Sequence, residues 1–199
     1  MKSIFPTWAF ILGLLITLNI LILHSTYSAG IMLSDEGGFI ETISAFAFMF
    51  SAILLFFRAL HKEGFELRLT LLFGVTCLLL FLREVDLDEL QVPYLIQFFG
   101  AESGRDYLFS MAYIGIIGMI LWKDRPDFKR KVSTCLRSPV SVAVLIGCVT
   151  LVISSFFEKR HLVLAEELLE MNGSLFILLA SLIHLVRPIY SNQENTNHL

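Results

Sequence analysis

Six long apolar runs constrain the fold of this chain more than any other feature of its sequence. Their lengths of 14 to 19 residues approach the roughly 20 that an α-helix needs to cross the hydrocarbon core of a bilayer. Of all residues, 56% are hydrophobic and only 17% are charged, fewer charges than a water-soluble surface requires. The sequence therefore predicts an all-α, six-helix transmembrane bundle. The runs cover residues 8–24, 39–57, 69–82, 107–122, 139–157 and 173–186.

The distribution of lysine and arginine predicts the orientation of these helices, because cytoplasmic loops carry an excess of positive charge. With the N-terminus inside, 11 of the 15 basic residues fall in cytoplasmic segments and 4 fall outside. We therefore expect both termini in the cytoplasm. A cleavable signal peptide is the alternative for the first run, but residues 25–30 lack an A-x-A cleavage site.

The chain is expected to form a single transmembrane helical domain over residues 1–190, followed by a disordered polar tail over 191–199. The basic segment 123–137 is expected to lie beside anionic lipid headgroups, so membrane lipids are predicted partners. The basic residues are few and no aromatic–basic module is present, which argues against nucleic acid. The three cysteines show no CxxC spacing and indicate no metal or redox motif.

Acidic residues gather in the segments predicted to face outward. The third apolar run is too short to span, and about 20 residues counted from Leu69 reach Asp88. The sixth run is short too, and the same count back from Val186 reaches Glu167. Thirteen of the 18 carboxylates lie in these outward segments: Asp35, Glu36, Glu41, Glu84, Asp86, Asp88, Glu89, Glu102, Asp106, Glu158, Glu166, Glu167 and Glu170.

Helical spacing selects a smaller set of these carboxylates as a candidate site. Glu84 and Asp88 are four residues apart and share a helix face, as do Glu166 and Glu170. Ser44 follows Glu41 by three residues and Ser174 follows Glu170 by four, so a hydroxyl lies beside each acid. Carboxylates at membrane depth are costly and usually functional. We therefore expect an outward-facing carboxylate cluster within the membrane.

Three hypotheses explain how such a cluster is neutralised. Ion pairing with Arg83, Arg105, Lys159 and Arg160 would make the acids structural. A divalent metal ion would make them ligands, since carboxylates bind Ca²⁺ or Mg²⁺ and added imidazole favours Zn²⁺. A proton or cation pathway is the third. The candidate metal ligands are Glu41, Glu84, Asp88, Glu167, Glu170, His24 and His161, supported by Ser44, Arg83, Glu166 and Ser174.

The segment from Glu41 to Phe50 resembles the helix bearing Glu and Ser in the CREST membrane hydrolases, the superfamily of alkaline ceramidases and progestin/adipoQ-type receptors. That resemblance implies a helical bundle whose zinc ion activates water to cleave an amide in a lipid. Those proteins have seven helices and bind zinc through three histidines, including an H-x-x-x-H pair. This chain has no H-x-x-x-H pair.

Three acidic motifs resemble those of bacterial polytopic membrane proteins with an acidic helix opening, an R-E-x-D helix end and an E-E-x-x-E final helix. The motifs are Glu36-Gly37-Gly38-Phe39-Ile40-Glu41, Arg83-Glu84-Val85-Asp86 and Glu166-Glu167-Leu168-Leu169-Glu170. This resemblance implies a multi-pass protein of the bacterial cytoplasmic membrane and no particular activity.

The predicted function is that of a multi-pass membrane protein whose carboxylates hold a metal for hydrolysis of a lipid-like substrate. The apolar loop 92–99 would then form a lid. The alternatives are a small cation or proton transporter and a structural or assembly protein. The structural alternative expects small residues at helix contacts, with Ala143/Gly147 and Gly115/Gly118 as the candidates.

Overall fold

The computed structural model describes residues 17, 19–22, 24, 38–85, 102–136, 138–160 and 162–186. Within these ranges the chain is helical and contains no β-strand, so the predicted all-α class is confirmed for them. The elements are α2 (Phe39–Ala59), α3 (Gly64–Glu84), α5 (Glu102–Lys123), the 3-10 helix η1 (Arg125–Asp127), α6 (Phe128–Leu136), α7 (Pro139–Glu158) and α8 (Val163–Val186).

Within the described ranges, four helices are long and apolar enough to cross a membrane: α2, α3, α7 and α8. Helix α5 has 22 residues, which is span length, but charged residues such as Arg105 and Asp106 in its first turns make it less apolar. Of the first apolar run, residues 17, 19–22 and 24 are described and have helical backbone.

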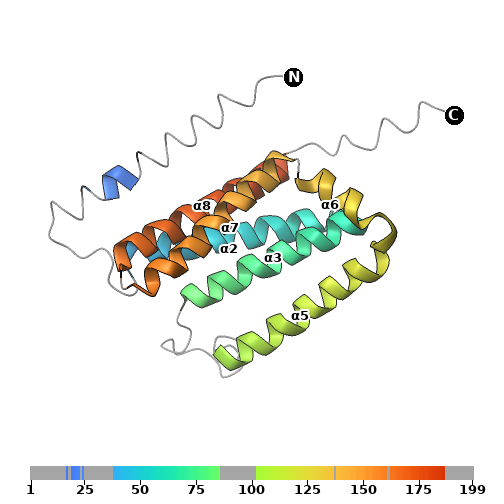
Figure 1. The fold of residues 1–199 in the computed structure, drawn as a ribbon, viewed down its shortest axis with the longest axis horizontal. Coiled ribbons are helices and arrows are strands. Elements are labelled where there is room, and N and C mark those ends of the chain that lie inside the picture. The colour runs from blue at the N-terminus through green and yellow to red at the C-terminus, as the bar shows by residue number, and fades with distance from the viewer. Residues whose placement is uncertain are drawn as a thin grey trace, which may run out of the picture.

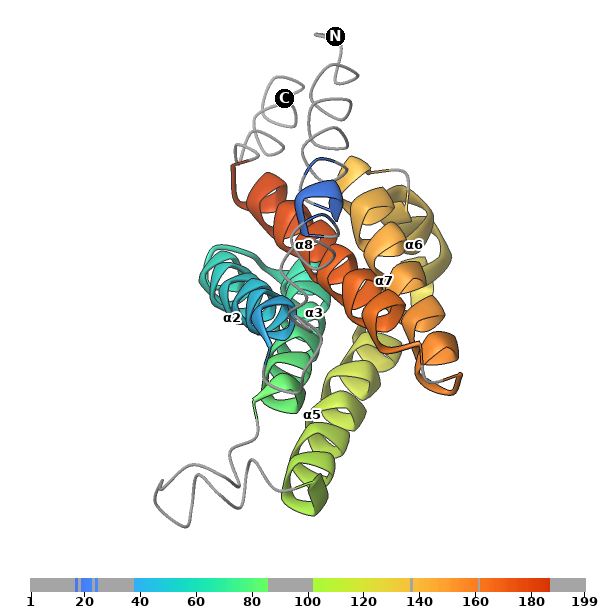
Figure 2. The same cartoon turned by 90° about the vertical axis from the view of Figure 1, so that its left-hand side faces the viewer.

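Helix α2 links α3 to α8. It packs against α3 on one side and α8 on the other, and α7 packs against α8 (Figures 1 and 2). Its packed face is built from small residues such as Ser44, Ala47 and Ser51, which let neighbouring backbones approach closely. Phe48 is fully buried on the same face. Helix α5 lies at the edge of the molecule, where it packs against α3.

The outward faces of the helices are apolar, which is the reverse of a water-soluble protein. On α2, Phe46, Phe50 and Phe57 are each about half exposed. On α5, Met111 is 75% exposed and Ile114 is 73% exposed. Large exposed apolar surfaces of this kind need an apolar solvent, because contiguous patches are rare on soluble monomers. Lipid-facing helices explain this pattern.

The structure corrects the predicted limits of the third helix. Helix α3 begins at Gly64 and ends at Glu84, instead of running from Leu69 to Asp88. It reaches span length by including residues 64–68, because Gly64 starts the helix with a φ of +62°, a conformation that favours glycine. Arg83 and Glu84 therefore lie in the last turn of α3, as the sequence predicted. Glu84 is the final residue of the helix.

Two local signals in the sequence determine where α7 begins. The Ser138 hydroxyl accepts a hydrogen bond from the Ser141 backbone N–H at 3.1 Å, which caps the helix. Pro139 follows at the first helical position, where its missing N–H costs nothing. This cap separates α7 from the short helix α6.

The closest helix approach joins α7 and α8 at two glycines. A Cβ atom on Gly147 would lie 2.8 Å from Ile177 Cγ1 and 2.9 Å from the Gly173 carbonyl oxygen. Ala143, one turn away, has no exposed surface, so the predicted contact role of Ala143 and Gly147 is confirmed. The same prediction for Gly115 and Gly118 is wrong, because a Cβ on either would meet nothing within 4 Å.

Candidate functional site

Arg83 joins the carboxylates of two helices at the end of α3. Its Nη2 atom donates to Glu84 Oε1 at 2.8 Å and to Glu170 Oε1 at 2.6 Å. Its Nε atom donates to the same Glu84 oxygen at 3.1 Å. Two predicted site carboxylates from α3 and α8 therefore meet on one guanidinium. We call Arg83, Glu84 and Glu170 the Arg83 cluster.

The carboxylates of the Arg83 cluster are more shielded than its guanidinium. The Glu84 side chain is 5% exposed and that of Glu170 is 16% exposed, against 45% for Arg83. From α7, the fully buried Ser154 places its hydroxyl 3.5 Å from Glu170 Oε1. Glu41 of α2 is an electrostatic neighbour of Glu84. Side chains from four helices thus gather at this end of the bundle.

The supporting serines Ser44 and Ser174 lie inside the bundle. Ser44 is 1% exposed and Ser174 is fully buried. Each hydroxyl donates to a carbonyl of its own helix, Ser44 to Ile40 and Ser174 to Met171. They serve as small polar residues within helix contacts and show no bond to a carboxylate. Glu166 and Glu167 are partly buried in the first turns of α8.

Arg83 is the cation that binds Glu84 and Glu170 at this end of α3. The other predicted cations make different contacts. Arg105 donates to the Leu82 carbonyl oxygen at 3.5 Å and lies 3.9 Å from Asp106. Lys159 and Arg160 are exposed and make no ion pair with the carboxylates that the structure describes.

Two candidate ligands, Asp88 and His161, lie outside the described residues, as do the loop 92–99 and the tail 191–199. His24 is described and is exposed. Within the described ranges, no three side chains of histidine, cysteine, aspartate or glutamate are arranged to hold a metal ion. The metal site stays a prediction, and Arg83 occupies the position between the two carboxylates.

A second charged cluster, which the sequence did not lead us to expect, lies at the other end of α3. Asp124, between α5 and η1, accepts hydrogen bonds from Arg68 Nε at 2.9 Å and Arg68 Nη2 at 2.6 Å. Lys131 of α6 donates to its second oxygen at 2.9 Å. We call these three residues the Asp124 cluster. Arg68 and Arg83 are 15 residues apart, which separates the two clusters by about 22 Å along α3.

The environment of Asp124 keeps it ionised. Burial by itself would raise the pKa of Asp124, whose side chain is only 3% exposed. Hydrogen bonds from Lys131 and Arg68, together with their charges, outweigh burial and hold the pKa below its usual value of 3.8. The signal that predicts this cluster is an aspartate placed directly after an apolar run and among basic residues.

A pair of amides also escaped prediction. Asn19 and Asn172 exchange two hydrogen bonds of 2.9 Å each between their side-chain amides. Beside them, Ile22, Ile40 and Met171 form a buried apolar cluster. An amide inside an apolar run is costly unless it is paired, so Asn19 was the available signal. The pair attaches the first helical segment to α8.

No protein-family model, no curated protein and no solved structure matches this chain. The two family resemblances noted from sequence motifs therefore stay predictions. The fold of the part of the chain that the structure describes defines the class: a helical protein with four helices long and apolar enough to cross a membrane. Two clusters of charged side chains lie at opposite ends of α3.

Proposed function

We propose that this chain is a structural or assembly protein of the bacterial cytoplasmic membrane, with six spans and both termini in the cytoplasm. In this proposal the outward carboxylates are ion-paired residues that hold helices together. The observation that carries it is Arg83 Nη2, which binds carboxylates of α3 and α8 at 2.8 and 2.6 Å. A guanidinium between two carboxylates performs the neutralisation that a metal ion would otherwise supply.

The shielding of the carboxylates supports a structural role. Exposed ion pairs contribute little to stability, because water screens them and long side chains lose entropy. Glu84 and Glu170 are largely buried, however, and Ser154 adds a hydroxyl from a third helix. Arg83 joins α3 to α8, both of which also pack against α2. The cluster therefore adds a charged connection between two helices at one end of the bundle.

Removing the Arg83 guanidinium tests the structural role. Arg83→Gln is expected to lower the free energy of unfolding by about 1.5–3 kcal/mol, the range for hydrogen bonds to charged groups. Detergent-solubilised protein titrated with sodium dodecyl sulfate measures this change. Arg160→Gln is the matched control, since Arg160 is exposed and makes no ion pair among the described residues. Equal stability of Arg83→Gln and wild type would contradict the proposal.

Cation binding is the second candidate function, because two carboxylates share one guanidinium and keep one net negative charge. A bound divalent ion would also be the first requirement for metal-assisted hydrolysis of a lipid. Ligands that bind the folded state raise its apparent stability. A rise in unfolding temperature with CaCl₂, MgCl₂ or ZnCl₂ that is lost in Glu84→Gln/Glu170→Gln would favour this candidate over the structural one.

Cysteine labelling in intact cells tests the proposed orientation. Lys129 and Lys159 are exposed and lie near opposite ends of α7, a helix long enough to cross the membrane. With the three native cysteines replaced by serine, Lys159→Cys is expected to react with a membrane-impermeant maleimide, and Lys129→Cys only after lysis. The opposite labelling pattern would show that the chain has the inverted topology.

A further inference from the structure

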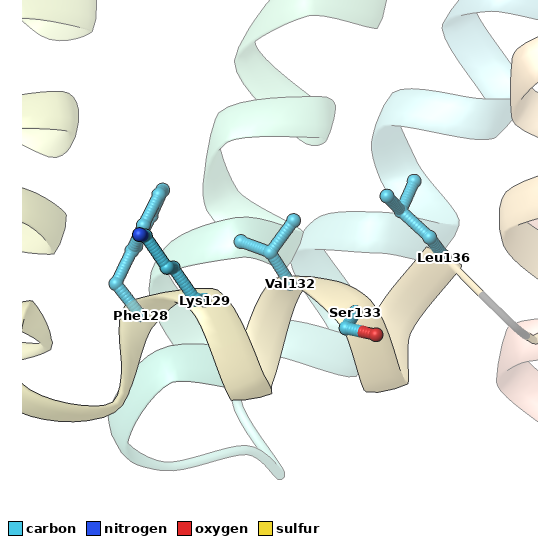
Figure 3. Close-up of a pocket in the computed structure, with 5 residues that line it drawn as sticks. All are labelled: Phe128, Lys129, Val132, Ser133 and Leu136. Carbon is cyan, nitrogen blue, oxygen red and sulfur yellow. The ribbon is translucent and has the colours of Figure 1, made fainter.

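Helix α6 presents an apolar stripe beside a groove. Phe128, Val132 and Leu136 follow one another at intervals of four residues and point to the same side of the helix (Figure 3). Together with Lys129 and Ser133 they line a cavity of about 390 Å³. The stripe therefore combines three apolar side chains with one cation at its edge.

A second hollow lies at the neighbouring end of α5. Its volume is about 520 Å³, and Gly118, Leu121, Trp122 and Arg125 line it. Trp122 is 86% exposed and Leu121 is 54% exposed. Trp side chains favour the membrane–water interface, where the ring stays apolar and the N–H reaches water. This hollow repeats the composition of the first: apolar walls with one basic side chain.

The cations of these two hollows are available, whereas their neighbours are engaged. Lys131 binds Asp124 and Arg130 lies 3.4 Å from Asp127. Arg125 and Lys129 are exposed and form no ion pair with any residue that the structure describes. Two unneutralised positive charges beside apolar grooves favour a ligand with a negative head group and an apolar chain.

The α6 groove is held in place by contacts to α3. The Phe65 and Phe128 rings pack edge to face with centroids 6.5 Å apart. Lys131 lies over the Phe65 ring at 5.9 Å while it binds Asp124. An interfacial helix fixed in this way offers a preformed site, which lowers the entropy cost of binding.

We propose that α6 and the adjoining end of α5 form a binding site for an anionic glycerophospholipid. An acyl chain lies along Phe128, Val132 and Leu136, and the phosphate binds Lys129 and Arg125. Amphipathic interfacial helices with basic residues attract anionic lipid by this combination of buried apolar area and charge. The inference is independent of the Arg83 cluster, which lies at the opposite end of α3.

Trp122 is a built-in reporter for this site, because the chain has only one other tryptophan, Trp8. We would place the full-length Trp8→Phe protein in nanodiscs that contain brominated phosphatidylglycerol or brominated phosphatidylcholine, whose bromines quench nearby tryptophan. The expected result is about fivefold tighter association of the brominated phosphatidylglycerol, the effect of one basic residue at an anionic surface. Ser133→Trp in the Trp8→Phe/Trp122→Phe background reports on the α6 groove in the same way.

The double variant Arg125→Gln/Lys129→Gln is expected to lose the preference while quenching by the brominated phosphatidylcholine stays at its original level, which shows that the protein remains folded. Lys159→Gln/Arg160→Gln removes two exposed cations at the other end of α7 and is expected to keep the preference. Equal quenching by both lipids, or a preference that survives Arg125→Gln/Lys129→Gln, would overturn the proposal.

Discussion

Replacing Asp124 by alanine is expected to lower the free energy of unfolding by about 3–5 kcal/mol, the range for breaking a buried ion pair. The Asp124 side chain is 3% exposed and binds Arg68, whose side chain is 13% exposed. Without the carboxylate, the Arg68 guanidinium is left shielded from water and without its anion. Three segments, α3, the α5–η1 junction and α6, lose their common contact.

Asp127→Ala is the matched control for this prediction, because Asp127 lies three residues further on, in η1, and is also ion-paired. Its side chain is 48% exposed and its partner Arg130 is 79% exposed, at a distance of 3.4 Å. An exposed pair of this kind contributes about 0–1 kcal/mol. Unfolding in detergent, followed by helical circular dichroism, measures both variants. A loss for Asp124→Ala no larger than that for Asp127→Ala would disprove the role of the Asp124 cluster.

The same aspartate predicts a pH dependence with a definite sign. The pKa of Asp124 in the folded protein lies below its usual value of 3.8, because Lys131 and Arg68 outweigh burial. A lowered pKa stabilises the folded state at pH values above the unfolded pKa, and the stabilisation is lost as the pH falls through the folded pKa. The stability difference between wild type and Asp124→Ala is therefore expected to stay constant from pH 7 down to about 5 and to shrink below 3.8.

Enlarging Gly147 is the other substitution with a large expected effect. Gly147→Val is expected to cost about 3 kcal/mol, at the upper end for overpacking a tight contact. A Cβ atom there would lie 2.9 Å from the Gly173 carbonyl oxygen, and backbone cannot move aside as a side-chain end can. Gly173 faces the same contact, since its Cβ would lie 2.8 Å from Thr150 Oγ1. Helices α7 and α8 must then separate along their whole contact.

Gly115→Val in α5 is the matched control for the glycine contact. A Cβ on Gly115 would meet nothing within 4 Å, so the added side chain is free to enter the surrounding lipid. We expect a stability change within about 0.5 kcal/mol, as for substitutions away from packed sites. Thermal unfolding of both variants in the same detergent measures the two stability changes. Similar losses at Gly147 and Gly115 would argue against a specific α7–α8 contact.

The sequence predicted part of the Arg83 cluster correctly for a physical reason. A carboxylate at the end of a membrane helix is costly, so the short third and sixth runs implied that Glu84 and Glu170 have partners. Both acids do lie in helices and both bind Arg83. The choice between an arginine and a metal ion at that position was open, because both neutralise carboxylates and spacing along one helix cannot distinguish them.

Other contacts were beyond prediction because they join residues that are distant in sequence. Asp124 and Arg68 are separated by 56 positions, and Asn19 and Asn172 by 153. The same limit explains the error over Gly115 and Gly118. A pair of small residues in a helix predicts close approach only if another helix lies against that face, and both glycines of α5 are exposed.

The sequence alone determined the class of this protein, because apolar runs of span length and scarce charge exclude a water-soluble fold. It also selected Glu41, Glu84, Glu167 and Glu170 as carboxylates in need of partners, and the structure joins Glu84 and Glu170 on Arg83. The tertiary structure decided which helices meet: α2 lies between α3 and α8, Arg83 reaches both carboxylates, and Asp124 joins α3 to α6. Helix formation depends on neighbouring residues in the chain, whereas helix pairing depends on side chains brought together only when the bundle packs.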